Sequence, residues 1–266
     1  MRRRVSVQLI LAAVLVAMLL LAVVAPGLIA GNPDAVDVAR RLAPPSAAFP
    51  FGTDETGRDV FARVVHGTRT TLGVVGAALV LAALVGGLLG MIAGFARGAP
   101  DLAVSRVADA VLAFPPIVLG VVIAGTLEAG IFTLVMALAL IYAPAFFRVA
   151  RAAALSECEL AYVEAARVLG HSEAAVLFRH VARNVAPTVL LQAVILFPLA
   201  LQISAALGFL GLGVQPPTPD WGASLQESRN YLTVAPWLAV FPGLALLLAS
   251  LAASLLGRVL SGEGRA

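Results

Sequence analysis

Three histidines are the side chains best suited to metal binding or acid–base chemistry, and they are scattered along the chain. His66 is separated from His171 and His180 by three long apolar stretches. If those stretches cross a membrane, as argued below, the first histidine lies on the opposite side from the other two. The three imidazoles therefore cannot form one metal or acid–base site.

Carboxylates gather in one short segment, where Asp54, Glu55 and Asp59 stand close together. Such oxygens could bind a hard cation such as Ca²⁺. Arg58 and Arg63 lie among them, however, so ion pairing is the plainer use of these acids. We expect a charged, structured segment here and no metal site.

Lysine does not occur in the chain, because all eighteen basic residues are arginines. A P-loop needs its lysine to reach the nucleotide phosphates, so ATP and Mg²⁺, if used, are expected on another chain and no cofactor is expected here. The arginines are scattered between apolar stretches and do not form a basic patch with interleaved aromatics, which argues against nucleic acid.

The composition indicates a membrane protein. Of the 266 residues 61% are hydrophobic and 12% charged, and the mean hydropathy is +0.98. A bilayer core needs about 20 apolar residues in helical form, and six stretches without Asp, Glu, Lys or Arg are long enough. We therefore predict an all-α membrane protein with one domain (1–266) and six transmembrane helices within 5–33, 70–96, 110–127, 129–147, 184–219 and 230–257.

The arginines also predict the orientation. With both termini in the cytoplasm, twelve arginines and seven acids lie inside, and six arginines and eight acids lie outside. The positive-inside rule favours this arrangement. It defines an external segment (34–69), a cytoplasmic loop (about 148–187) and an external loop (about 211–230).

The external segment contains turn residues followed by a helical pattern. Val60, Phe61, Val64 and Val65 recur at helical spacing, which predicts a short amphipathic helix at the outer interface that feeds the second span near Thr70. A solvated loop is the alternative.

The cytoplasmic loop predicts two short helices joined by an elbow. Gly170 suits a helix C-terminus and Ser172 an N-cap, and the second helix is expected to reach about Val185 before Pro187 opens the fifth span. On the first helix one apolar arc is formed by Leu155, Cys158, Tyr162, Ala166 and Leu169.

Small residues recur every four positions along the second span. Such a stripe lets another helix approach closely, so we predict tight packing within the chain, with a role in gating as the alternative. The stripe consists of Ala78, Ala82, Gly86, Gly90 and Gly94. Prolines within the third, fourth and fifth spans mark possible kinks.

Three motifs carry a family resemblance. Glu164-Ala165-Ala166 followed by Gly170 resembles the EAA loop of permease subunits of ATP-binding cassette importers. The segment FGTDETGRDVFARVVHGTRTTL (51–72) and the segment GFLGLGVQPPTPDWGASL (208–225) are similar to those of the C-type permease of the dipeptide, oligopeptide and nickel family. The resemblance extends over nearly the whole chain.

This resemblance implies the type I importer permease fold in a prokaryotic cytoplasmic membrane. It implies a partner permease, usually a non-identical B-type, together with two ATPase subunits or domains and an extracytoplasmic solute-binding protein. The elbow that seats in the ATPase would contain Glu164, Ala165, Ala166, Gly170 and Ser172. The external element that contacts the partner permease or the binding protein would be shaped by Gly52, Thr53, Asp54, Gly57, Arg58 and Asp59.

Two departures from the family pattern limit this transfer. Ala182-Arg183 stands where the family loop commonly has Leu-Pro, and Ser204 stands where relatives often carry Glu. No charged gate residue is therefore assigned in the fifth span.

The expected cargo is a di- or oligopeptide, with nickel or a haem-like ligand as the alternative within the family. An ion-coupled secondary transporter is the alternative from another class. Against it, Asp109 and Glu128 fall at span ends, and no carboxylate lies in the middle of a span for ion coupling.

Overall fold

Helices form nearly all the regular structure of residues 2–261, the part of the chain whose backbone this computed structural model describes, with side chains described from residue 13 onward. The long helices are α1 (Arg2–Val24), α2 (Val60–Ala96), α5 (Ile131–Glu157), α8 (Ala182–Phe209) and α10 (Trp237–Leu260). The shorter helices are α3 (Gly98–Leu112), α4 (Pro116–Thr126), α6 (Ala161–Val168), α7 (Glu173–Ala175) and α9 (Trp221–Ser228).

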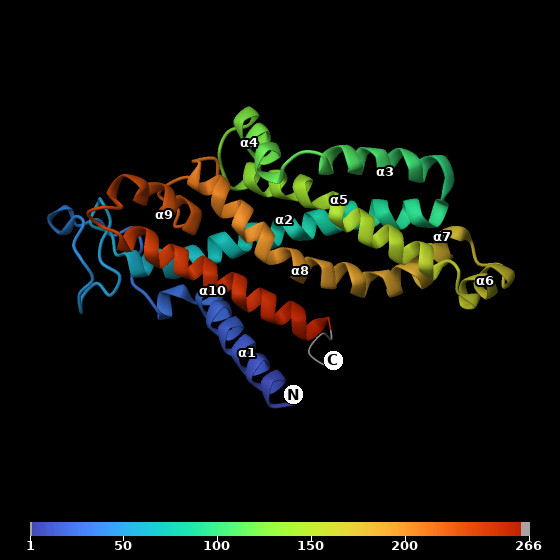
Figure 1. The fold of residues 1–266 in the computed structure, drawn as a ribbon, viewed down its shortest axis with the longest axis horizontal. Coiled ribbons are helices and arrows are strands. Elements are labelled where there is room, and N and C mark those ends of the chain that lie inside the picture. The colour runs from blue at the N-terminus through green and yellow to red at the C-terminus, as the bar shows by residue number, and fades with distance from the viewer. Residues whose placement is uncertain (1, 262–266) are drawn as a thin grey trace.

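Helices α2, α5 and α8 run along the long axis of the molecule and form its centre (Figure 1). The predicted stripe of small residues lets α2 lie directly against α5. A Cβ atom added at Gly86 would lie 2.1 Å from the carbonyl oxygen of Ala143, and one at Gly90 would lie 2.2 Å from that of Phe147. No side chain fits at these distances, so the stripe serves packing within the chain.

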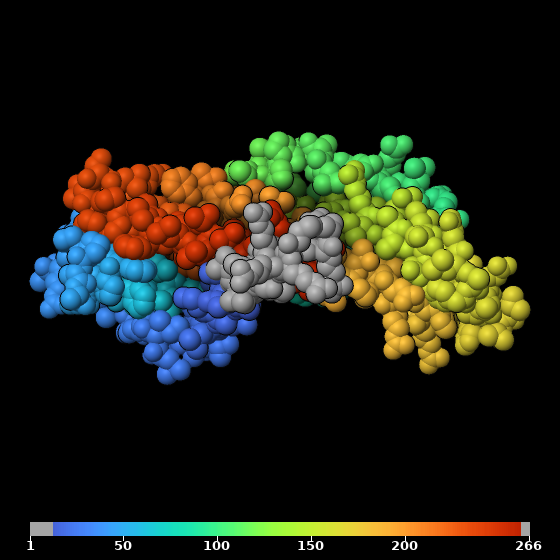
Figure 2. Space-filling model, turned by 60° about the horizontal axis from the view of Figure 1, so that its bottom comes forward, coloured from blue at the N-terminus to red at the C-terminus, as the bar shows by residue number. Residues whose placement is uncertain are grey.

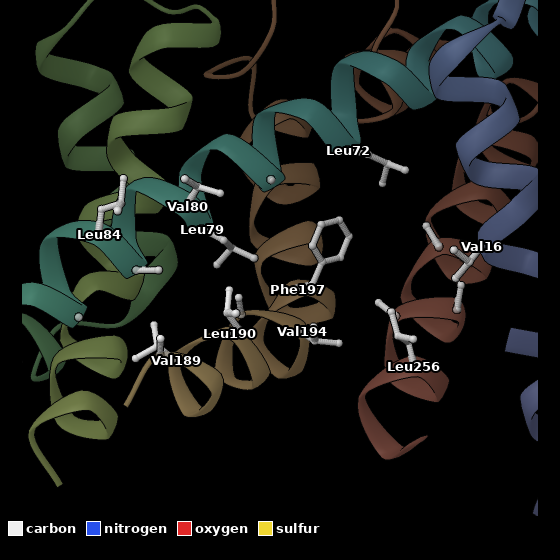
Figure 3. Close-up of a pocket in the computed structure, with 18 of the residues that line it drawn as sticks. Val16, Leu72, Leu79, Val80, Leu84, Val189, Leu190, Val194, Phe197 and Leu256 are labelled. Atoms are coloured by element: carbon white, nitrogen blue, oxygen red, sulfur yellow. The ribbon is translucent and has the colours of Figure 1, made fainter. Parts of the chain in front are cut away.

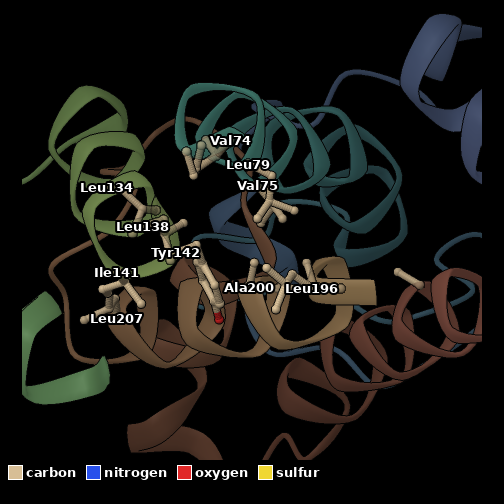
Figure 4. Packing of buried hydrophobic residues seen from close by; sticks show 14 of the residues in the cluster. Val74, Val75, Leu79, Leu134, Leu138, Ile141, Tyr142, Leu196, Ala200 and Leu207 are labelled. Carbon is tan, nitrogen blue, oxygen red and sulfur yellow. The ribbon is translucent and has the colours of Figure 1, made fainter. Parts of the chain in front are cut away.

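The largest buried cluster fills the space between these three helices (Figure 4). Val75 of α2, Leu138 of α5 and Leu201 of α8 are all fully buried in it. Trp221, at the start of α9, is also fully buried and closes one end of the cluster. The central helices are therefore held by side-chain packing as well as by close backbone approach.

Within the described residues, four helical segments are long and apolar enough to cross a membrane: α2, α5, α8 together with the turns before it (Glu173–Phe209), and α10. The pair α3 and α4 makes a fifth span if it is counted as one. The searched part of α1, Ala13–Val24, is apolar and shorter. The prediction of an all-α membrane protein is confirmed, and six spans fit the structure when α1 is counted with the other five.

The third span is longer than the stretch that we predicted over 110–127, and its prolines do mark a kink. It starts at Gly98 and bends by 91° between α3 and α4. The bend follows from Pro115 and Pro116, because proline disfavours a helical conformation in the residue before it and removes a backbone donor.

Two predicted helix boundaries are wrong. The short interfacial helix at Val60 is not separate, because α2 runs without a break from Val60 to Ala96. The fifth span does not open at Pro187, because α7, a π-helical turn (Val176–Val181) and α8 are continuous and Pro187 lies inside α8. Proline is tolerated within membrane helices when neighbours satisfy the freed carbonyls.

The molecule has two distinct ends. The α6 end carries α6, α7 and the first turns of α8, and the α9 end carries α9 and the segment before α2 (Figure 1). In the space-filling view the yellow and gold α6 end projects beyond the blue α1 and the red α10 (Figure 2). The start of α1 and the end of α10 both point toward the α6 end.

Candidate functional site

The predicted site residues form two groups at opposite ends of the bundle. Those of the external segment lie at the α9 end, and those of the EAA motif lie at the α6 end. The structure brings each group together locally, but it keeps the two groups apart. Each is described separately.

At the α9 end, residues 42–59 fold into a compact, turn-rich element held by backbone hydrogen bonds, which we call the knot although the chain is not threaded through itself. Thr53 and Asp59 form an isolated antiparallel bridge, and the Thr53 amide donates to the carbonyl of Ala43 at 3.0 Å. The chain turns at Gly57, whose φ is +82° and whose added Cβ would lie 1.8 Å from the carbonyl oxygen of Asp37. Only glycine fits there. The predicted turn chemistry therefore builds a folded element and not a solvated loop.

Two residues of this knot belong to a buried cluster of charges. Asp54 pairs with Arg58 at 2.6 Å, and Glu227 of α9 lies 3.4 Å from Arg63 and 3.7 Å from Arg58. Burial raises the pKa of the Asp54 carboxyl, but hydrogen bonds from Thr56 and Arg58 outweigh it and hold that pKa below its ordinary value. Asp54 therefore stays ionised at neutral pH, and the cluster joins the knot to α9.

A second set of contacts ties α9 to α2. Thr71 donates a hydrogen bond to Asp220 at 2.6 Å, and the indole nitrogen of Trp221 donates to the carbonyl of Val64 at 2.9 Å. Asp220 also caps α9 by accepting from the amide of Ala223. The segments 51–72 and 208–225, which carry the family resemblance, thus meet in one structural unit at the α9 end.

The predicted external residues lie within this unit. Gly52, Thr53, Asp54, Gly57 and Arg58 are buried. Asp59 is half-buried and caps α2 by accepting from the Phe61 amide at 2.9 Å. These residues therefore hold the element together. Among the described residues, no three His, Cys, Asp or Glu side chains are placed to hold one metal ion.

At the α6 end, a tight elbow joins α6 to α7. Gly170 adopts a φ of +83°, and its amide donates to the carbonyl of Arg167 at 3.0 Å. Ser172 caps α7 by accepting from the Ala175 amide at 3.3 Å. The helix stop at Gly170 and the N-cap at Ser172 are where the sequence predicts them, and this is the local chemistry that reverses the chain direction.

Polar contacts fix the elbow to the long helices. Asn184 of α8 donates to Glu157 of α5 at 3.0 Å and to the Tyr162 hydroxyl of α6 at 2.9 Å, while Tyr162 also donates to Glu157. Arg167 of α6 pairs with Glu173 of α7 at 3.2 Å. Three helices therefore share one hydrogen-bonded group where α6 begins.

The buried face of α6 is not the arc that we predicted. Val163 and Ala166 are buried against the π-helical turn, whereas Leu169, which we placed on the apolar arc, is 79% exposed. The prediction fails because α5 ends at Glu157, so residues 155–169 do not form one continuous helix. Glu164 and Ala165 of the EAA motif are exposed, and Val168 is 82% exposed.

The acids that a secondary transporter could use have other roles. Asp109 of α3 pairs with Arg148 of α5 at 2.6 Å. Glu128 lies in the turn before α5, where its carbonyl accepts a hydrogen bond from the Thr133 hydroxyl. Both fall at helix ends, where we expected structural roles for them.

Two residues of these sites were missed by sequence reasoning. Glu227 completes the charge cluster, and Asn184 joins α8 to the elbow. Glu227 is the only acid between Asp220 and the last few residues, which was a signal that it needs a partner. That partner, Arg63, lies 164 positions away in the sequence, so only the fold identifies it.

Comparisons with known proteins agree with this architecture. The model of the family described as "Binding-protein-dependent transport system inner membrane component" matches residues 86–262. The chain is 37% identical over 246 residues to the probable D,D-dipeptide transport system permease protein DdpC of Escherichia coli (strain K12), which covers 92% of this chain and 83% of that protein.

Other relatives carry related names. The di/tripeptide transport system permease protein DppC of Pseudomonas aeruginosa (strain UCBPP-PA14) is 40% identical over 222 residues, covering 81% of this chain and 73% of that protein. The glutathione transport system permease protein GsiD of Pectobacterium atrosepticum is 37% identical over 213 residues, covering 80% and 71%. The chain belongs to the family of inner membrane components of binding-protein-dependent transport systems.

Proposed function

We propose that this chain is one of two permease subunits of an ATP-driven importer of small peptides. Its α6 end binds the ATPase subunits and is displaced when they move. One observation carries the proposal. The elbow at Gly170 projects beyond the bundle and presents Val168 and Leu169 to solvent, while its other face is fixed to α5 and α8 (Figure 1).

This arrangement suits the transmission of force. Val163 and Ala166 bury one side of α6, and the hydrogen bonds of Tyr162 and Asn184 join it to two long helices. A displacement of the elbow would therefore move α5 and α8 with it as rigid bodies. In the proposed cycle, ATP-driven closure of the ATPases moves the elbow, and the attached helices switch the pathway between inward-facing and outward-facing states.

Energy must come from another chain in this proposal. The absence of lysine rules out a P-loop in this sequence. ATP and Mg²⁺ are therefore assigned to two partner ATPase subunits or domains, which would bind around Glu164, Ala165, Ala166, Gly170 and Ser172.

The excess of arginine supports a cytoplasmic location for the α6 end and for both termini. The α9 end would then face outward from a prokaryotic cytoplasmic membrane. Because the predicted contact residues there are buried, the exposed Val36 (60%) and Val38 (65%) beside the knot are better candidates for contact with the second permease or the solute-binding protein.

The proposed cargo follows from the relatives. Proteins named for D,D-dipeptide, di/tripeptide and glutathione transport support small peptides over nickel or haem-like ligands. The translocation path would run between this chain and a second permease, which the family resemblance indicates to be a non-identical B-type.

The test is uptake of a labelled dipeptide into proteoliposomes that contain the chain with its co-purified partners. We expect uptake to require ATP and to be insensitive to collapse of ion gradients. Leu169→Asp places a charge on the exposed elbow and should abolish uptake, whereas Leu232→Asp, at a half-exposed site of the α9 end, should retain it. Uptake driven by an ion gradient without ATP would overturn the proposal.

A further inference from the structure

One face of α8 carries polar side chains along the span. Thr188, Gln192 and Gln202 lie on it, with Ile195 and Leu199 between them. The intervals from 188 to 202 are four, three, four and three residues, so all five side chains share one side of the helix. Thr188 and Gln202 are exposed, Gln192 is half-buried, and Ile195 and Leu199 are 47% and 53% exposed. We call these five residues the polar face of α8.

Two other open surfaces of the spanning helices are apolar. A groove between α1, α2, α8 and α10 is lined only by apolar residues and glycine, and Val194 and Phe197 project into it from another side of α8 (Figure 3). On α10, the exposed side chains between Val240 and Leu251 are all valine or leucine. These surfaces suit contact with hydrocarbon. The polar face of α8 does not.

The glutamines of the polar face lack hydrogen-bond partners. Ser254, an exposed polar residue of α10, donates to the carbonyl of Ser250 in its own helix at 2.8 Å. In the part of the chain that the structure describes, Gln192 and Gln202 form no such bond. An amide without partners is strongly disfavoured in hydrocarbon, and polar side chains within spans face a protein interior or a water-filled cavity. The polar face therefore borders water or another polar surface.

The length and neutrality of this face favour a path for a solute. Thr188 and Gln202 are fourteen residues apart, which is about 21 Å of helix within a bilayer core of about 30 Å. The face carries no charge over this length. Neutral groups placed along a span offer several weak sites in succession, and a solute that must leave as well as enter needs such sites.

We propose that the polar face of α8 lines the path of the peptide and that Gln192 and Gln202 hydrogen-bond the peptide backbone during passage. The inference rests on the proposed function, in which the path runs between this chain and a second permease. The second permease then lies across the path from this face and not against it. Because a glutamine amide both donates and accepts, it pairs with backbone groups, which small peptides share whatever their side chains.

The first experiment measures the access of water to single cysteines in the reconstituted full-length chain with its partners. Gln192→Cys, Gln202→Cys and Leu247→Cys are compared in a Cys158→Ala background, because Cys158 is the only cysteine of the chain. Leu247 is 62% exposed on α10 and lies outside the groove, so it serves as the lipid-facing control. The probe is a charged methanethiosulfonate reagent present on both sides of the membrane. Label on this chain is measured by mass spectrometry, with ATP and without it.

We expect Gln192→Cys and Gln202→Cys to be labelled at least tenfold faster than Leu247→Cys in one or both nucleotide conditions, because the reagent reacts with thiolates in water. Labelling no faster than that of the control in both conditions would overturn the proposal. It would mean that the second permease or lipid covers this face.

A second measurement tests the contact with the peptide. The double variant Gln192→Leu/Gln202→Leu removes both amides at similar side-chain volume. We expect dipeptide uptake to fall about fivefold for each lost hydrogen bond, while assembly with the partners and ATP hydrolysis persist. Leu247→Ala should leave uptake unchanged. Unchanged uptake in the double variant would overturn the proposal.

Failure of the proposed function would look different. Uptake by the unsubstituted protein would then not depend on ATP. The labelling rates need no transport cycle, so they would still report whether water reaches the polar face.

Discussion

Substitutions at Gly170 test whether the elbow transmits force. The residue has a φ of +83°, and an added Cβ would meet nothing within 4 Å. Gly170→Ala therefore adds only the cost of left-handed backbone, about 1–2 kcal/mol, which shifts the population of the correct elbow by a factor of about 5–30. Gly170→Asn should cost less, because asparagine tolerates this conformation.

Gly170→Pro should act most strongly. Proline fixes φ near −65° and removes the amide that donates to Arg167 at 3.0 Å. The assay measures peptide imported per ATP hydrolysed in proteoliposomes. We expect this ratio to fall in the order Gly, Asn, Ala, Pro, while the amount of protein in the membrane stays the same.

Gly98 supplies a matched control. It has a φ of +72°, and an added Cβ would also meet nothing within 4 Å. Gly98→Ala thus introduces the same kind of backbone strain at the turn between α2 and α3, which lies at the same end of the molecule as the elbow but is not part of it. If Gly98→Ala uncouples transport as strongly as Gly170→Ala, or if Gly170→Pro keeps full coupling, the elbow does not carry the force.

Further predictions concern packing and charge. Gly86→Val should destabilise the chain by at least about 1–3 kcal/mol, because its Cβ would meet the Ala143 carbonyl. Gly73→Val has open space around its Cβ and should cost less. Thermal unfolding in detergent compares the two variants. Asp54→Asn should cost about 3 kcal/mol by breaking a buried ion pair. The pKa of Asp54 lies below its ordinary value of 3.8. The stability that its ionised carboxylate contributes is therefore fully present above pH 3.8 and is lost as the pH falls further. The unsubstituted protein should therefore lose more stability than Asp54→Asn below about pH 4, and equal losses would contradict this.

The helices could be predicted largely from charge and hydrophobicity, because a span must be long and nearly free of charge. Their boundaries could not. Pro187 looked like a helix start, yet it lies inside α8, where the surrounding bundle tolerates it. The prolines of the third span marked a possible kink, but its size, 91° between α3 and α4, is known only from the structure.

The two candidate sites were predictable to different degrees. Gly170 and Ser172 build the elbow through local backbone chemistry, so sequence spacing is enough to place them. The role of the external motif is tertiary. The family resemblance assigned Asp54 and Arg58 to an external contact element, but in the fold they are buried and Arg58 lies 3.7 Å from Glu227 of α9. Neighbours in sequence can be predicted, whereas a partner 164 positions from Arg63 requires the fold.

The most direct test of the central claim is photo-crosslinking in the native membrane. A benzophenone amino acid is placed at Leu169 on the elbow, and in a separate variant at Val38 beside the knot, both of which are exposed. Crosslinked products are identified by mass spectrometry. We predict that residue 169 captures a P-loop ATPase and that residue 38 captures a permease or a solute-binding protein. Capture of the ATPase by residue 38, or capture of lipid alone by residue 169, would contradict the account.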